Sequence, residues 1–175
     1  MKASIGFTLV ELLMGLAILS IVTTTVVPSF SQLIAEQRLR QVSNELRLSL
    51  ALARSEAIKR NESVNVLPVA NTWSEGWCVE PNAAGGCTSA PIGAYVVPKN
   101  IRVSGASGAT GIAFNSWGRT ASCPRFEIAT SVANSTCSLC LYIEIDGRAV
   151  AAPGTCANRC PGVDSDFSWS GACSL

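Results

Sequence analysis

The residues of this sequence that could take part in chemistry are its cysteines and one acidic residue near the N-terminus. The chain has 175 residues, with eight cysteines and no histidine. The lack of histidine excludes Ser-His and Cys-His nucleophilic sites. Serine and lysine residues show no spacing typical of a catalytic dyad. We therefore expect that the protein is not an enzyme and needs no cofactor.

The cysteines are predicted to form disulfides, because an even number in a small, loop-rich domain is typical of an oxidising compartment. Zinc is the alternative, since Cys137-Ser-Leu-Cys140 has the spacing of half a site, but the other cysteines contain no second such pair. Cys78 and Cys87 flank a flexible loop and are predicted to pair. Cys123 is expected to pair with Cys137 or Cys140, and the remaining cysteines with one another locally. The eight candidates are Cys78, Cys87, Cys123, Cys137, Cys140, Cys156, Cys160 and Cys173.

Glu11 is the only charged residue in the apolar segment Phe7–Val27, which has 21 residues. About 20 apolar residues span a bilayer as a helix, and a carboxylate inside such a span is costly and rarely without function. A secretory signal peptide would carry its small-residue cleavage site after the apolar segment, whereas Gly6 precedes it. A cut after Gly6 would place the new amine of Phe7 one helical turn from Glu11, as its countercharge in the same chain or a neighbouring one.

A long helix must position this carboxylate. After Pro28, apolar residues recur with a period of 3.6, which predicts an amphipathic helix; they are Leu39, Val42, Leu46, Leu50, Ala53 and Ala57. One helix from Phe7 to about Lys59 would be roughly 80 Å long. Two acid–base pairs at i,i+4 spacing, Glu36 with Arg40 and Glu56 with Arg60, support it. The basic residues of this helix are interpreted as a solvated face; they are Arg38, Arg40, Arg47, Arg54, Lys59 and Arg60.

Short β-rich segments alternate with turn residues from Ser63 onward, which is typical of an antiparallel sheet. The expected strands are Val64–Leu67, Gly76–Val79, Ala94–Val97, Ile101–Val103, Ile112–Phe114, Arg125–Ile128, Leu139–Ile145 and Arg148–Ala151. The last two should form a hairpin at Asp146-Gly147. The net charge is only +1, with no acidic or basic tail, so bulk charge predicts no partner. We expect an α+β fold, with a long N-terminal α-helix packed on a small antiparallel β-sheet domain.

The segment Gly6-Phe7-Thr8-Leu9-Val10-Glu11 resembles the cleavage motif of type IV prepilins at every position. The resemblance implies a type IV pilin fold, cleavage between Gly6 and Phe7 by a prepilin peptidase, and N-methylation of Phe7 by the same enzyme. It implies that Glu11 pairs with the N-terminus of a neighbouring subunit during assembly, and that Pro28 kinks the helix. The expected parts are a leader (1–6), a transmembrane and polymerisation helix (7–28), an amphipathic helix (29–60) and a disulfide-braced β-rich domain (61–175).

Three further segments resemble the minor pilins and H-type pseudopilins of the GspH/FimT/FimU class. They are residues 39–60 with Ala53-Arg54-Ser55-Glu56-Ala57, Ile112-Ala-Phe-Asn-Ser-Trp-Gly118-Arg119, and Ile143-Glu-Ile-Asp-Gly147-Arg148. The resemblance implies a minor type IV pilin that takes part in pilus initiation and assembly, and so in twitching motility and adhesion. The implied partners are other minor pilins and the major pilin. The alternative is an H-type minor pseudopilin of a type II secretion system.

DNA binding is a further alternative, because some FimT-type minor pilins capture DNA for natural transformation through a Gly-Arg-x-Arg turn. The matching residues here are Gly147-Arg148-Ala149-Val150, so valine replaces the second arginine. This departure favours a role in assembly. Arg119, Arg125, Arg148 and Arg159 remain possible DNA contacts. The expected location is the bacterial inner membrane, crossed once with the C-terminal domain in the periplasm, and then the surface pilus; Lys2 favours a cytoplasmic N-terminus.

Overall fold

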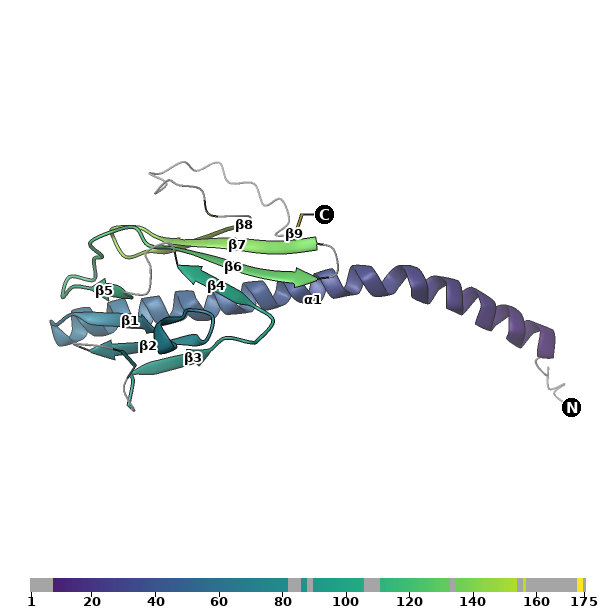
Figure 1. The fold of residues 1–175 in the computed structure, drawn as a ribbon, viewed down its shortest axis with the longest axis horizontal. Helices are drawn as coiled ribbons and strands as arrows, with labels where there is room; N and C mark the ends of the chain where they lie inside the picture. Colours follow the sequence, from purple (N-terminus) through teal and green to yellow (C-terminus); the bar gives the residue numbers. More distant parts are fainter. Residues whose placement is uncertain are drawn as a thin grey trace, which may run out of the picture. The chain divides into compact units, whose positions relative to one another are not determined.

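The computed structural model describes residues 8–81, 86–87, 90–105, 111–132, 135–153, 156 and 173–174. One long helix, α1 (Leu9–Arg60), is followed by short strands (Figure 1). The strands are β1 (Val64–Pro68), β2 (Gly76–Pro81), β3 (Gly93–Val96), β4 (Arg102–Gly105), β5 (Ile112–Phe114), β6 (Arg125–Val132), β7 (Ser135–Ile143), β8 (Ala149–Pro153) and β9 (Cys173–Ser174), with a 3-10 helix, η1 (Val69–Asn71), after β1. The chain divides into two units, Met1–Ile34 and Ala35–Leu175, each of which is described by itself.

The domain half of α1 has the apolar stripe that the sequence predicts. Leu39, Leu46 and Ala53 are fully buried, and the other three residues of the stripe are at most 1% exposed. The predicted ion pairs are also present, at 2.6 Å between Arg40 and Glu36 and at 2.7 Å between Arg60 and Glu56. The helix ends because Asn61 adopts a left-handed conformation (φ 55°) and Glu62 N–H donates to Ala57 O, the pattern of a Schellman cap.

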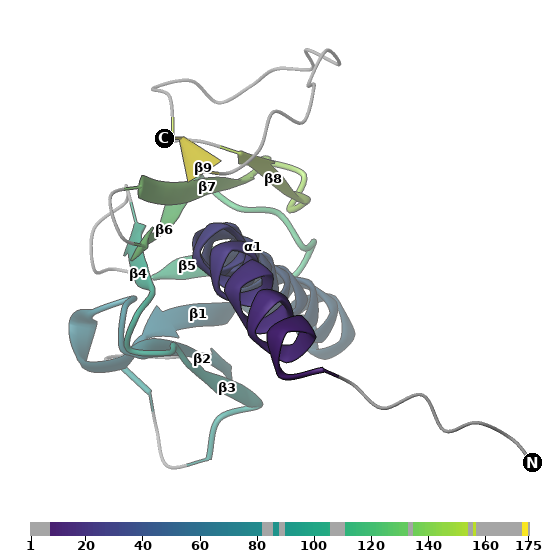
Figure 2. The same ribbon diagram turned by 90° about the vertical axis from the view of Figure 1, so that its right-hand side faces the viewer.

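The strands form two antiparallel sheets rather than the single sheet expected from the sequence. One sheet has the order β3-β2-β1-β5, and the other has the order β4-β6-β7-β8, with β9 also paired to β7. The part of α1 from Ala35 onward packs against both sheets (Figure 2), and the largest fully buried side chains, Trp77, Phe114 and Phe126, belong to the core that the three elements share. The fold is therefore the expected α+β arrangement, with a divided sheet.

The hairpin predicted at Asp146-Gly147 is confirmed, although its strands differ from the prediction at their ends. Gly147 has φ +84° and its N–H donates to Glu144 O at 2.8 Å, so the turn begins at Glu144 and β7 ends at Ile143. The β7–β8 register places Tyr142 opposite Val150.

Among the described residues, two disulfides have both of their cysteines identified. Cys78 pairs with Cys87, as predicted, and closes a loop at the end of β2. Cys140 on β7 pairs with Cys156, which follows β8, so the predicted pairing of Cys123 with Cys140 is wrong and Cys156 does not pair locally. Cys137 is also disulfide-bonded, and its backbone lies opposite Cys173 in the β7–β9 register. Because Cys137 and Cys140 are both oxidised, this Cys-x-x-Cys segment is not half of a zinc site. Cys160 lies outside the described residues.

The N-terminal unit contains the first part of α1. Its large apolar side chains are exposed on every side of the helix, from Leu9 (74%) to Val22 (49%). Among the residues with described side chains, which exclude 24–29 and 32 within α1, no helix is long and apolar enough to qualify as a membrane span.

Candidate functional site

The start of α1 carries the acidic residue of the predicted assembly motif. Thr8 precedes the helix, and its Oγ1 accepts a hydrogen bond from Glu11 N–H at 3.3 Å, as an N-capping residue does. The Glu11 side chain is exposed, and its carboxylate forms no ion pair with any described residue. The first helical turn is a favourable position for an acidic residue because of the helix dipole, and the exposed side chain of Glu11 is open to a partner there.

The other predicted processing and assembly residues are only partly described. Gly6 and Phe7 lie outside the described residues, so cleavage, methylation and the Glu11–Phe7 pairing stay predictions. Helix α1 continues through Pro28, and the kink expected there also stays a prediction.

The domain presents a groove of about 1080 Å³ between α1 and β8, which we name the arginine groove. Its α1 wall is formed by residues three or four positions apart, so that they share one side of the helix. Its other wall is β8 with the turn that precedes it. The lining residues are Asn44, Arg47, Leu48, Ala51, Arg54, Ser55, Ile58, Gly147, Arg148, Ala149, Val150 and Ala151.

Two glycine turns meet at one end of this groove, and the stem of Arg54 lies against both. Gly118 and Gly147 have φ of +71° and +84°. A Cβ on Gly118 would lie 3.0 Å from Arg54 Cγ, and a Cβ on Gly147 would lie 3.3 Å from Arg54 Cδ and 2.4 Å from Gly118 O. Glycine is therefore required at these positions for backbone conformation and also for close packing.

The candidate DNA contacts are placed differently from one another. Arg119 and Arg148 are exposed and follow the two adjacent glycine turns, which are joined by a hydrogen bond from Thr120 N–H to Ile145 O at 3.3 Å. Arg125 lies opposite Tyr142 in the β6–β7 register, away from the groove lining. Arg159 lies outside the described residues. Of the three that are described, only Arg148 lines the groove.

Arg47 and Arg54 belong to the helix face that the sequence predicts to be solvated, and Arg47 is exposed, but their place in a groove was not predicted. Both line the groove beside Arg148. The signal was their spacing of seven residues, which places them on one side of the helix, on the same wall as Leu48, Ala51 and Ile58. Their neighbour Glu56 belongs to another cluster: hydrogen bonds from Arg60 and then Lys59 lower the pKa of its carboxyl.

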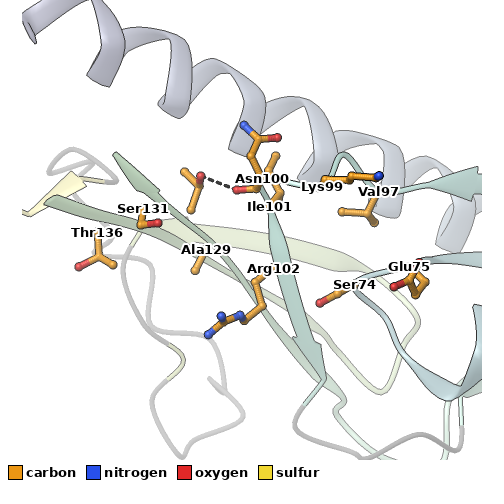
Figure 3. Close-up of a pocket in the computed structure, with 11 residues that line it drawn as sticks. Ser74, Glu75, Val97, Lys99, Asn100, Ile101, Arg102, Ala129, Ser131 and Thr136 are labelled. Atoms are coloured by element: carbon orange, nitrogen blue, oxygen red, sulfur yellow. Dashed lines mark hydrogen bonds between the residues drawn. The ribbon is translucent and has the colours of Figure 1, made fainter. Parts of the chain in front are cut away.

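A second pocket, of about 630 Å³, is lined by residues around β4 and β6 (Figure 3). Thr130 Oγ1 donates to Asn100 O at 2.7 Å across it. Its charged side chains do not converge, because Arg102 points away from Lys99 and Glu75 (Figure 3). The described lining residues of this pocket therefore do not focus charge on a ligand.

Two family models match the sequence of this chain. The family model "Type II transport protein GspH" matches residues 42–147, more than half of the chain, and the "Prokaryotic N-terminal methylation motif" matches residues 1–27. No curated protein matches the sequence.

Two crystal forms of the type IV minor pilin FimU from Pseudomonas aeruginosa (strain PAO1) have a similar fold. The first has 21% sequence identity and a TM-score of 0.56, and the match covers 67% of this chain and 90% of that chain. The second has 20% identity and a TM-score of 0.55, with 65% and 92% covered. This likeness shows that the domain and helix have the type IV pilin fold. From the family match, the methylation motif and the fold together, the chain belongs to the GspH family and is a prepilin-like protein of the GspH/FimT/FimU type.

Proposed function

We propose that this protein is a minor type IV pilin, which is stored in the inner membrane, cleaved after Gly6, methylated on Phe7 and then packed into a pilus. The observation that carries the proposal is the structure of the first part of α1, where one exposed carboxylate, Glu11, lies in the first turn of a helix with apolar side chains on every side. A helix that is apolar all round is stable only in lipid or among other helices. A membrane would supply the lipid, and a filament core would supply the other helices.

In this proposal, Glu11 sets the register of assembly. Its carboxylate has no partner among the described residues, and a charge buried among apolar helices needs a countercharge. The free amine of Phe7 in a neighbouring subunit would supply that charge. The apolar helix would then form the filament core, and the disulfide-braced domain would face solvent. Other minor pilins and the major pilin are the partners that this arrangement requires.

The test replaces Glu11 and follows the protein into sheared surface pili. We expect Glu11→Ala to be inserted in the membrane and cleaved like the original protein, but to be depleted from pili. Glu36→Ala is the matched control, because Glu36 is an acid on the same helix with an i,i+4 partner, and it should be incorporated normally. Normal incorporation of Glu11→Ala would contradict the salt-bridge account.

An H-type minor pseudopilin of a type II secretion system is the second candidate. The match of residues 42–147 to the GspH family model supports it, and the same N-terminal chemistry would serve both filaments. Deletion of the gene separates the two: loss of surface pili supports the pilin, and loss of protein secretion with normal pili supports the pseudopilin. DNA capture has less support, because valine stands at the second arginine position of the Gly-Arg-x-Arg turn.

A further inference from the structure

We propose that the arginine groove binds an extended, acidic segment of another protein chain, which adds as a strand to the outer edge of β8. This inference deepens the proposed function, because it names the chemistry of a partner subunit. The inference rests on the proposed function only where it identifies the partner as another subunit, because the groove is present in the isolated domain.

The first argument is the exposed backbone of β8. This strand ends the order β4-β6-β7-β8, and among the described residues no strand pairs with its outer edge. Glu144 N–H donates to Arg148 O at 2.9 Å, so these two residues form a hydrogen-bonded pair. Bonded and non-bonded pairs alternate in an antiparallel ladder. The backbone groups of Ala149 and Ala151 must therefore point outward, away from β7.

The opposite edge of the same sheet provides a contrast. At β4, Val103 N–H donates to Ser74 Oγ at 3.0 Å, and the same hydroxyl donates to Val103 O at 3.0 Å. One side chain thus occupies both outward groups of Val103, which is a way to protect an edge strand. For the described residues, no side chain covers Ala149 or Ala151 in this manner. The unprotected edge is the one beside the groove.

The second argument is charge. Arg47, Arg54 and Arg148 line the groove, and none of the described residues that line it is acidic. The ion pair of Arg148 Nε with Asp146 Oδ2 is long at 3.9 Å and both side chains are exposed, so it neutralises Arg148 only weakly. Three guanidinium groups around one groove fit a partner that carries carboxylates.

The third argument separates a polypeptide from a nucleic acid. Leu48 and Ile58 are 64% and 51% exposed, and three residues of β8 add further apolar surface. Such walls suit the alternating side chains of a strand, while phosphates and sugars gain nothing from them. No aromatic residue is present among the described lining residues to stack on bases. The groove therefore fits an acidic polypeptide better than DNA.

The experiment uses the full-length protein in detergent micelles and a fluorescent heptapeptide of alternating valine and glutamate. We expect this peptide to bind, as measured by fluorescence anisotropy, and a peptide with lysine in place of glutamate not to bind. Hydrogen exchange should show the amides of Ala149 and Ala151 protected in the complex. An oligothymidine of similar length tests the nucleic-acid alternative.

Three variants test the two parts of the site. Arg47→Gln combined with Arg148→Gln should weaken peptide binding about tenfold through the loss of two charge-assisted contacts. Ala151→Pro removes one outward N–H and no ladder bond, so it should weaken binding about fivefold. Arg102→Gln, on the opposite edge strand, should leave the affinity unchanged. The thermal unfolding midpoint of each variant checks that the domain is folded.

Two results would overturn the inference. In one, the glutamate peptide fails to bind, or binds with no change in exchange at Ala149 and Ala151. In the other, oligothymidine binds more tightly than the peptide, and its affinity is the same for the original protein and for the Ala151→Pro variant. Either result leaves the proposed function standing if the protein is still found in sheared pili. If the peptide binds in the groove but the protein is absent from pili, the result would contradict the proposed pilin function and leave the groove inference standing.

Discussion

At the scale of single residues, two serines on the domain half of α1 have opposite environments. Ser49 Oγ accepts a hydrogen bond from Trp77 Nε1 at 2.9 Å and donates one to Glu45 O at 2.9 Å. Trp77 is fully buried, so its N–H depends on this acceptor. Ser43 is also buried, but its hydroxyl has no hydrogen-bond partner among the described residues. The same substitution should therefore have opposite effects at the two positions.

Ser49→Ala should destabilise the domain by about 1–3 kcal/mol, because it leaves a buried indole N–H unsatisfied. Ser43→Ala should be neutral or stabilise it by up to about 1 kcal/mol, since it removes an unsatisfied hydroxyl and alanine favours helix. Thermal unfolding of the full-length protein in micelles, followed by tryptophan fluorescence, measures both. Equal destabilisation by the two variants would show that the Trp77–Ser49 bond contributes nothing specific.

Tyr95 provides a second prediction, on pH. Burial raises the pKa of its phenol, and the negative charge of Glu45 raises that pKa further. Glu45→Gln should therefore lower the pKa of Tyr95, although it should stay above the ordinary value of 10.0 because burial is the larger cause. Tyrosinate absorbance in a Tyr142→Phe background isolates this titration, since the chain has two tyrosines.

The sign of the linked stability follows from the raised pKa. A phenol whose pKa is higher in the folded than in the unfolded state contributes stability that is fully present below the unfolded value. That contribution is lost as the pH rises through the folded pKa. The domain should thus lose stability above about pH 10, and less so in the Tyr95→Phe variant. A pKa of Tyr95 that does not respond to Glu45→Gln would contradict the electrostatic part of this account.

At the scale of elements, the two glycine turns hold the arginine groove in shape. Gly147→Ala should destabilise the hairpin by about 2–4 kcal/mol, because the new Cβ would sit in a left-handed conformation and overlap Gly118 O. Gly93→Ala is the control: Gly93 has no positive φ, and its Cβ would lie 3.2 Å from the flexible end of Leu52 and 4.0 Å from Val79 Cγ2, with no backbone atom as close. Hydrogen exchange across residues 115–118 and 144–148 should increase in Gly147→Ala alone.

Some of these elements could be predicted from the sequence and others could not. The buried stripe of α1 and the Asp146-Gly147 turn were predictable because they depend on contacts within a few residues. The division into two sheets was not, since it depends on long-range pairing such as Val64 with Phe114. The groove was missed for the same reason: Arg47 and Arg54 look like a solvated face until β8 returns beside them.

At the scale of the whole molecule, the disulfides add covalent links between strands of the sheets and the segments that follow those strands. Cys140–Cys156 ties the central strand β7 to the chain after β8, across a sequence separation of 16. Cys78–Cys87 ties β2 to its own loop, across a separation of 9. The first bond therefore restrains more of the unfolded chain, and it also secures the strand that forms one wall of the arginine groove.

Removal of the Cys140–Cys156 bond should therefore destabilise the domain more than removal of the Cys78–Cys87 bond. By loop entropy, Cys140→Ala with Cys156→Ala should cost about 3 kcal/mol, and Cys78→Ala with Cys87→Ala about 2.5 kcal/mol. Thermal unfolding measures both double variants, and hydrogen exchange locates the effect. In the first variant, exchange should increase along β8 and at Ala149 and Ala151 in particular; in the second, it should increase at the end of β2 and leave β8 unchanged. Equal exchange along β8 in both variants would mean that the β7–β8 ladder alone holds the groove wall in place. The Cys140–Cys156 bond would then stabilise the domain without shaping the surface of the arginine groove.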